Sequence, residues 1–506
     1  MVQHLPALLV VVPLLTALSV SALSWLAPRL CLPLTFGCIG FSLASSIGIL
    51  MEVIASGPVV YTMGGWSSPI GIVYVIDYLS APILVVVTAV ALINLVASSK
   101  QIDRDFSDKK GTFYTLYILF VTGMVGIVAT GDAFNLYVLL EIAALTGYSL
   151  IGLGQPRAPL SSLNYLFIGT IGASFYLLGV GYLYIATGSL NMADLARFIA
   201  MPEHSSSTMV MFAFIICMTG LFTKMGLFPL HGWLPNAYSH ASPASSALLA
   251  PLTTKVMIYA MIRVCLYVFT PAYVFGTLQI SNAIVWIAVA AIVVGSLMAL
   301  TQKSLFKMLT YIVIAEVGYM VGGFFLGNRM GITGSTLHII NDAAMTLCLF
   351  LAAGAITYRT KSDSFSDLKG IFKRMPFTMT AFTVGALAVI GIPPTCGFFS
   401  KWYLIIGGIN AGHYGFATAL IFSSLVNAVL FFRIFEIAYF QSPGDSKDHH
   451  HHHHHGHHRH KDKMVEAPLS MLVPLMITAL SLIVLGIYTG DIVTHVIQAA
   501  IPGVIS

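Results

Sequence analysis

Long apolar segments follow one another along almost the whole of this 506-residue chain. A transmembrane helix needs about 20 apolar residues, and a window of about 19 residues finds about fourteen candidates. Only helices or closed barrels satisfy their backbone hydrogen bonds in lipid, and barrel strands span only about 10 residues. We therefore predict an all-α polytopic membrane protein. The candidate helices lie near residues 5–25, 30–53, 72–98, 112–129, 133–153, 161–187, 208–230, 244–269, 283–301, 305–326, 333–357, 376–408, 413–439 and 468–488.

The composition of the chain agrees with a membrane location. Charged residues make up 8% of it and apolar residues 57%. A soluble protein of this composition would expose large apolar patches, so the lipid bilayer is the expected surrounding. The net charge of +5 does not indicate a nucleic-acid partner, because the basic residues lie in short loops rather than in one run. The six cysteines are spread singly and are expected to be buried.

The loops predict how the chain is oriented in the membrane. Loops after odd-numbered segments carry most of the lysine and arginine residues, whereas loops after even-numbered segments contain only Arg197 and Arg329. Cytoplasmic loops of membrane proteins are enriched in these two residue types. We therefore expect the loops after odd-numbered segments to be cytoplasmic and both termini to lie outside.

Two of the predicted helices contain sequences that interrupt a helix. The seventh runs into residues 228–235 (FPLHGWLP), and the twelfth contains residues 391–397 (GIPPTCG). Proline removes a backbone donor and clashes with the preceding turn, so both stretches are expected to be kinked or unwound. Lys224 precedes the first break and Lys401 follows the second. Interrupted helices at matching positions are typical of transporters built from inverted repeats, so we predict two such repeats, each with a broken helix.

A histidine-rich tract from His449 to His460 lies between the last two segments and is predicted to be cytoplasmic. Weak Zn²⁺ or Ni²⁺ binding and a patch that becomes cationic at low pH are functional interpretations of this tract. A disordered linker is preferred, and no fixed metal site is predicted.

The repeats and this tract suggest a division of the chain into five parts. The parts are 1–110 with helices 1–3, 111–270 as the first repeat with helices 4–8, 271–440 as the second repeat with helices 9–13, 441–467 as the histidine-rich loop, and 468–506 as the last helix and a short tail.

Ionisable side chains occur deep inside the apolar segments. A charge in mid-membrane costs several kcal/mol unless it faces a protein or water-filled interior, so a residue kept there is expected to belong to an ion path. A structural scaffold remains an alternative, but helix packing alone does not need so many buried charges. The residues are Glu141, Lys224, Lys255, Glu316, Asp342 and Lys401.

Several motifs resemble those of one known family. They are GGW at 64–66, YVID at 74–77, GDAFNLY at 131–137, EI at 141–142, KMGLFPLHGWLPNA at 224–237, GIPP at 391–394 and GFFSKW at 397–402. Together they resemble the proton-translocating antiporter family, which includes antiporter-like subunits of NADH:quinone oxidoreductase, membrane-bound hydrogenases and multisubunit Mrp sodium/proton antiporters. The resemblance covers nearly the whole chain, and within the family it is closest to the Mrp antiporters, in particular their D-type component.

This resemblance implies a function. It implies a proton-conducting subunit of a multisubunit Na+/H+ antiporter in a bacterial cytoplasmic (inner) membrane, with other membrane subunits as partners and no enzyme activity of its own. A proton-pumping subunit in the membrane arm of a redox complex is the alternative. No cofactor is expected, because the chain lacks cysteine clusters for iron–sulfur ligation and a region for a dinucleotide fingerprint.

The resemblance also implies residue roles in the first half. Glu141 and Lys224 form an ion pair that acts as a proton switch, because a buried lysine keeps its proton only while its carboxylate partner is charged. Lys255 is the next relay group, and Lys401 is the exit-side group of the second half. A structural salt bridge is the alternative for the pair, and a lysine reaching the membrane interface is the alternative for Lys401.

Two histidines near Lys255 in the sequence are further candidates for the proton pathway. His231 lies inside the KMGLFPLHGWLPNA motif, and His240 follows it. A lone histidine is more often a core residue or a helix cap than a proton carrier, and that interpretation stays open for both.

The second half departs from the family pattern in segments ten and eleven. Most members have a second histidine and then a lysine where this chain has Asp342 and Thr346, and Glu316 stands where a neutral residue is expected. His338, Asp342 and Thr346 are spaced i, i+4 and i+8 and so share one helix face. Because hard cations prefer oxygen ligands, we predict that Glu316, Asp342 and Thr346, with His338 beside them, help to bind Na+ or a proton alternating with it. The alternative is that loss of the lysine disables this half-channel and that the carboxylates serve structure.

Overall fold

The computed structural model describes residues 4–205, 207–441, 464–501 and 503. The tract from His449 to His460 lies outside these residues, so its predicted role stays a prediction. Among the residues that the structure describes, thirteen helices are long and apolar enough to cross a membrane. They are α1 (Leu5–Leu26), α2 (Cys31–Ser56), α3 (Ser80–Asp105), α4 (Lys110–Ala129), α5 (Ala133–Gly152), α6 (Ala158–Thr187), α9 (Thr208–Met225), α11 (Pro243–Tyr267), α12 (Ser281–Leu300), α13 (Leu305–Phe325), α14 (Arg329–Thr360), α18 (Tyr414–Phe440) and α19 (Leu469–Ile487).

The twelfth predicted segment, 376–408, is present as two shorter helices. α16 (Pro376–Ile390) ends at Gly391, which has a left-handed φ of 92°, and α17 (Cys396–Asn410) begins after the two prolines. The seventh segment is broken in the same way, since α9 ends at Gly226 with a φ of 73° and α10 (Leu234–His240) follows a run of turns. The predicted all-α fold with a broken helix in each half is therefore confirmed.

Short elements lie between the long helices and after α19. The helices are α7 (Met192–Ile199), α8 (Pro202–Ser205), α15 (Ile371–Arg374), α20 (Thr489–Ile492) and α21 (Gln498–Ala500), and the strands are β1 (Val59–Thr62) and β2 (Val73–Ile76). The two strands pair antiparallel, with Val59 opposite Ile76.

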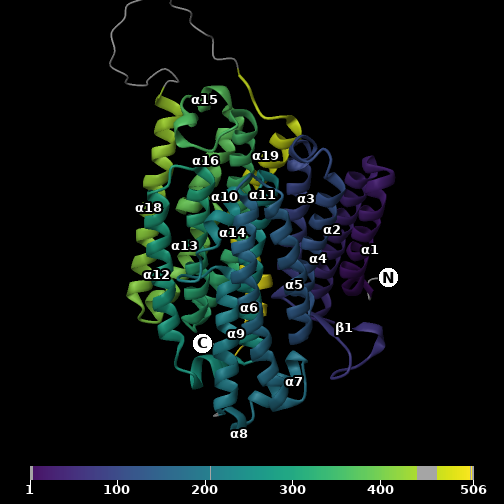
Figure 1. Cartoon of the computed structure of the whole chain (residues 1–506). Coiled ribbons are helices and arrows are strands. Elements are labelled where there is room, and N and C mark those ends of the chain that lie inside the picture. The colour runs from purple at the N-terminus through teal and green to yellow at the C-terminus, as the bar shows by residue number, and fades with distance from the viewer. Residues whose placement is uncertain (1–3, 206, 442–463, 502, 504–506) are drawn as a thin grey trace, which may run out of the picture.

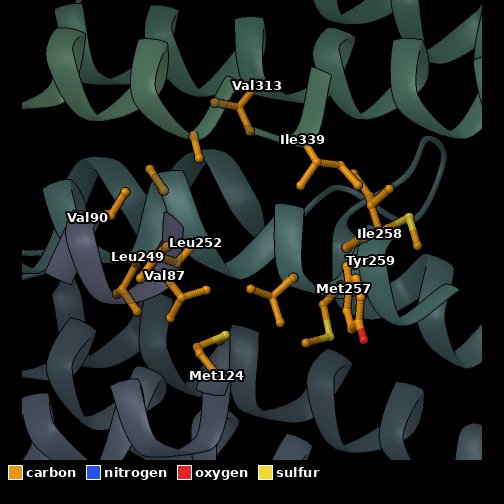
Figure 2. Packing of buried hydrophobic residues seen from close by; sticks show 14 of the residues in the cluster. Val87, Val90, Met124, Leu249, Leu252, Met257, Ile258, Tyr259, Val313 and Ile339 are labelled. Carbon is orange, nitrogen blue, oxygen red and sulfur yellow. The ribbon is translucent and has the colours of Figure 1, made fainter. Parts of the chain in front are cut away.

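The long helices form one bundle with their axes roughly aligned (Figure 1). α11 is buried along its whole length, and α13 and α14 along nearly all of theirs, so these three helices lie at the centre. Figure 2 shows side chains of α11, such as Leu252 and Ile258, between Val87 and Met124 on one side and Val313 and Ile339 on the other. All six cysteines are buried and free, as predicted.

The hairpin β1–β2 and α7 lie at the same end of the bundle (Figure 1). The Gly131 N–H donates to the Val73 carbonyl over 2.8 Å, and the Met192 N–H donates to the Gly131 carbonyl over 3.0 Å. A methyl group on Gly131 would lie 2.6 Å from Val75 Cγ2. The turn before α5 therefore joins the hairpin to α7, which explains the glycine in the GDAFNLY motif.

Glycines allow α6 and α9 to approach closely. A methyl group on Gly220 of α9 would lie 2.5 Å from the carbonyl oxygen of Gly172 in α6. Small residues at such crossings let membrane helices pack backbone to backbone. Because Lys224 lies one turn after Gly220, this crossing fixes the position of the lysine.

Candidate functional site

The first buried ion pair joins α5 to α9. Lys224 Nζ lies 3.1 Å from Glu141 Oε1, with 3% of the lysine side chain and 22% of the glutamate side chain exposed. α5 is started by Asp132, whose side chain accepts a hydrogen bond from the Asn135 N–H and so caps the helix. The predicted contact between Glu141 and Lys224 is thus present, and Glu141 is its more open member.

Aromatic side chains hold Lys224 in place. Its ammonium donates to the Tyr148 hydroxyl over 3.4 Å, and the Tyr148 ring packs edge-on against Tyr165 at 4.5 Å. Tyr165 stacks on Trp233 at 3.7 Å, and the Trp233 indole N–H donates to the Thr223 carbonyl. The broken stretch after α9 therefore folds back onto the helix turn that carries Lys224.

The second buried ion pair joins α11 to α14. Lys255 Nζ lies 2.9 Å from Asp342 Oδ2, and both side chains are at most 2% exposed. Lys255 also donates to Thr346 Oγ1 over 3.2 Å, and the Thr346 hydroxyl donates to Asp342 Oδ1 over 2.8 Å. Of the helix-face stripe predicted for α14, Asp342 and Thr346 are therefore directed at Lys255.

Glu316 of α13 lies against the same aspartate. Glu316 and Asp342 are both fully buried, and each carboxyl group is close enough to influence the other electrostatically. Glu316 Oε1 has no hydrogen-bond partner among the described residues. Two acids therefore face one lysine, Lys255, in this buried region.

Lys401 occupies the break between α16 and α17. Its ammonium donates to the carbonyls of Val389 and Ile390 over 2.6 and 3.4 Å, and to Ser424 Oγ over 3.0 Å. The last carbonyls of a helix lack intrahelical donors, so the end of α16 supplies free acceptors to the lysine. Lys401 is 4% exposed, which places it in the protein interior rather than at a lipid interface.

His338 completes the set of residues predicted for a cation site. Its Nδ1 lies 2.8 Å from Ser400 Oγ, and its Nε2 is buried without a partner among the described residues. Asp342 and Thr346 both contact the Lys255 ammonium, whereas His338 is directed towards α17. The four predicted residues thus lie around one buried region, with a lysine as the cation at Asp342.

The two candidate histidines near Lys255 in sequence are placed differently. His240 Nδ1 lies 2.7 Å from Ser161 Oγ, and burial together with the charges of Lys307 and Arg157 lowers the pKa of His240 below its usual value. His231 lies in the turns before α10, with its ring 5.4 Å from the ring of Phe228. No contact between either histidine and Lys255 is present in the described part of the chain, so their predicted pathway role remains a prediction.

One further buried ion pair was not predicted. Arg263, near the end of α11, donates to Asp77 Oδ2, and the guanidinium and carboxylate side chains are 4% and 10% exposed. Asp77 Oδ1 also accepts from the Ser80 N–H at the start of α3. Burial alone would raise the pKa of Asp77, but Arg263 and Ser80 hold it below its usual value. Arg263 could have been recognised as a buried charge from the sequence, because it lies two turns after Lys255 in an apolar segment.

Together, these contacts place several buried acids and amines inside the bundle. Each ammonium has a carboxylate, hydroxyl or carbonyl oxygen within hydrogen-bond distance. Such groups exchange protons without any metal or cofactor, and the loss of one partner changes which neighbour holds the proton.

Comparison with known proteins identifies similar chains. A family model described as "NADH:quinone oxidoreductase/Mrp antiporter, TM" matches residues 130–427. The NADH-quinone oxidoreductase subunit N of Desulforudis audaxviator (strain MP104C) is 42% identical over 514 residues, which cover 99% of each chain. A relative from Bacillus subtilis (strain 168), named as the D-type component of a Na(+)/H(+) antiporter, is 31% identical over 413 residues, covering 80% of this chain and 81% of that protein.

Two solved complexes contain chains of the same shape. A chain of the Mrp complex from Dietzia sp. DQ12-45-1b superposes with a TM-score of 0.87 at 25% identity, covering 99% of this chain and 97% of that one. A chain of the membrane-bound sulfane sulfur reductase, an archaeal respiratory membrane complex, gives a TM-score of 0.88 at 27% identity, covering 98% and 97%.

Proposed function

This chain belongs to the NADH:quinone oxidoreductase/Mrp antiporter family, and from that membership we propose that it is the proton-conducting membrane subunit of a multisubunit Na+/H+ antiporter. On this proposal the chain is not an enzyme by itself. Its partners are other membrane subunits, protons and Na+, in a bacterial cytoplasmic membrane. The supporting observation is the pair of buried ion pairs, Glu141–Lys224 and Lys255–Asp342, on neighbouring helices at the core of the bundle.

In the first half, Glu141 and Lys224 act as the proton switch. A proton that reaches the more open Glu141 neutralises the carboxylate and leaves the Lys224 ammonium with Tyr148 as its remaining hydrogen-bond partner. An unpaired buried ammonium releases its proton readily, because burial disfavours the charged form. The Lys224 proton then moves towards Lys255 and the second half.

In the second half, Asp342 has two competing partners. Its carboxylate pairs with the Lys255 ammonium and lies near the carboxyl group of Glu316. A proton or a Na+ ion arriving at Asp342 would take the place of the ammonium, with Glu316, Thr346 and His338 as further ligands. Lys401 then carries charge out of this half. One carboxylate that accepts either ion gives the exchange that an antiporter needs.

A membrane-arm subunit of a redox-driven proton pump is the second candidate. The observation that favours it is the 42% identity, over nearly full length, to a protein named as a subunit of NADH-quinone oxidoreductase. Both candidates use the same buried groups and differ in what drives the protons. Each charge moved is worth about 2.3 kcal/mol per 100 mV, so either driving force is sufficient.

Reconstitution of the whole complex in sealed vesicles tests the proposal. An imposed Na+ gradient should acidify or alkalinise the lumen, as reported by a pH-sensitive dye, without any electron donor. Lys224→Met should lower the initial rate at least about tenfold. Proton flux that needs a reduced donor and ignores Na+ would instead support the redox-driven pump, and full flux in Lys224→Met would exclude the proposed switch.

A further inference from the structure

A cavity of about 500 Å³ lies beside the hairpin and α7. Its walls come from β1, β2 and their connection, from the start of α7, and from the end of α11. Figure 1 shows that the hairpin and α7 lie at one end of the bundle. The positive-inside rule places this end outside, because it contains the loops after segments two, four, six and eight. The strand β2 and the connection between the strands carry the motifs YVID at 74–77 and GGW at 64–66, for which the proposed relay has no role.

The inner wall of the cavity carries a charge. Arg263 lines it, is only 3% exposed, and is paired with Asp77. Arg263 Nη2 donates to the Val75 carbonyl over 3.4 Å, but its Nε has no partner among the described residues. Arg263 therefore keeps one buried donor unpaired among the described residues at this wall of the cavity.

The same helix links this wall to the proposed relay. Lys255, Tyr259 and Arg263 follow one another at i, i+4 and i+8 on α11, so they lie along one side of the helix. The rise per residue puts Lys255 and Arg263 about 12 Å apart along the axis. Tyr259 is fully buried between them, and its hydroxyl donates to the Val128 carbonyl over 2.8 Å.

The outer rim of the cavity carries a fixed carboxylate. Asp194 on α7 accepts hydrogen bonds from Ser68 Oγ over 2.6 Å and Ser189 Oγ over 3.1 Å. Arg197 lies 3.6 Å away, but 79% of its side chain is exposed. An exposed ion pair of this kind contributes little, so the hydroxyls rather than the arginine hold Asp194 at the opening.

We propose that this cavity is the outward-facing mouth of the proton path and that Asp77 is the group that passes protons between α11 and the cavity. A proton from the α11 side binds the Asp77 carboxylate and releases its contact with Arg263. Loss of that proton to water in the cavity restores the ion pair, so no charge is left behind. This role rests on the proposed function of the chain as a proton conductor.

Thiol modification in the reconstituted complex tests the position of the mouth. Ala193 lines the cavity and is exposed, and all native cysteines are buried, so Ala193→Cys introduces a single accessible thiol. The membrane-impermeant cationic reagent MTSET, added from outside, should lower Na+-driven proton flux at least about tenfold. Ala200→Cys is the matched control, because Ala200 is exposed at the end of α7 but does not line the cavity.

The control should react with MTSET and keep its flux. Full flux after complete modification of Ala193→Cys would overturn the proposal. This outcome differs from failure of the proposed function, in which unmodified protein shows no Na+-driven flux at all. Asp77→Asn provides a second measurement. It should reduce flux, whereas Asp77→Glu should keep flux near the wild-type rate. Equal flux in the wild type and both variants would show that the Asp77–Arg263 pair has only a structural role.

Discussion

At the residue scale, each buried ammonium is positioned by acceptors from other parts of the chain. Lys224 contacts a glutamate and a tyrosine of α5, and Lys255 contacts an aspartate and a threonine of α14. Lys401 instead uses carbonyls freed by the break after α16. The three lysines therefore differ in how easily each ammonium loses its hydrogen-bond acceptors. On the proposed function, this difference suits proton transfer in successive steps rather than at one shared site.

Removal of the Asp342 charge should lower both the stability of the complex and its transport rate. Asp342→Asn leaves the buried Lys255 ammonium without a carboxylate, and loss of one partner of a buried pair costs about 3–5 kcal/mol. We expect a lower unfolding temperature in detergent and loss of Na+-driven flux. Both can be measured on the same purified complex.

A double variant provides the control for this prediction. Lys255→Met with Asp342→Leu removes both charges, and buried pairs replaced by apolar residues are often neutral or stabilising. We expect recovered thermal stability without recovered flux. Wild-type Na+ affinity and rate in Asp342→Asn would contradict the cation site, and flux in the double variant would contradict the relay.

At the scale of single elements, breaks and close crossings bring the charged groups together. The stretch after α9 returns Trp233 to the turn that carries Lys224. The break after α16 places Lys401 against free helix carbonyls, and the α6–α9 crossing fixes the height of Lys224 relative to Tyr148. Substitutions that add a methyl group to glycines at these points should therefore slow transport.

Gly220→Ala should move α9 away from α6. The added methyl would lie 2.5 Å from the Gly172 carbonyl oxygen and 2.7 Å from the Tyr176 nitrogen, so the helices must separate. Overpacking of this kind costs about 1–3 kcal/mol. We expect a lower unfolding temperature and slower flux, because Lys224 shifts away from Tyr148. Gly181→Ala on α6 is the control, since nothing lies within 4 Å of its added methyl.

Gly391→Ala should affect Lys401 directly. The residue has a φ of 92°, and a methyl there would lie 3.2 Å from the Lys401 Cδ. Left-handed backbone costs a non-glycine residue about 1–2 kcal/mol. Gly412→Ala carries a similar cost at a φ of 71° with open space around it. We expect both variants to lose stability, measured by thermal unfolding, and only Gly391→Ala to lose flux; equal flux would argue against a transport role for this contact.

At the scale of the whole molecule, the bundle has two chemically different ends. One carries the hairpin, α7 and the cavity lined by Arg263, and the other carries α15 and the basic loops (Figure 1). Buried acids and amines lie inside the bundle. On the proposed function, membrane orientation decides from which side protons and Na+ reach each half.

Orientation can be measured with impermeant thiol reagents on intact cells. Ala200→Cys, at the end predicted to be outside, should react at once, whereas Ser366→Cys in a predicted cytoplasmic loop should react only after permeabilisation. Native cysteines are all buried and should contribute little background. The reverse labelling pattern would invert the topology and move the proposed mouth to the cytoplasmic side.

Much of this organisation could be predicted from the sequence because the bilayer imposes simple rules. Segment length, apolar composition and the prolines at residues 229, 235, 393 and 394 fix the number of helices and the two breaks. Charge in an apolar segment is costly, so Glu141, Lys224 and Lys255 stand out without any structure. The family resemblance, carried by motifs along nearly the whole chain, is confirmed by the matching family model.

Only the tertiary structure decided which of these groups meet. The partner of Lys255 is Asp342, 87 positions later and in the other repeat, and no spacing rule connects them. The Asp77–Arg263 pair was missed for the same reason, since the hairpin that presents Asp77 is placed by hydrogen bonds to the turn before α5. Helix periodicity fixes which residues share a face of one helix, but contacts between helices depend on crossings and breaks set by the packing of the whole bundle.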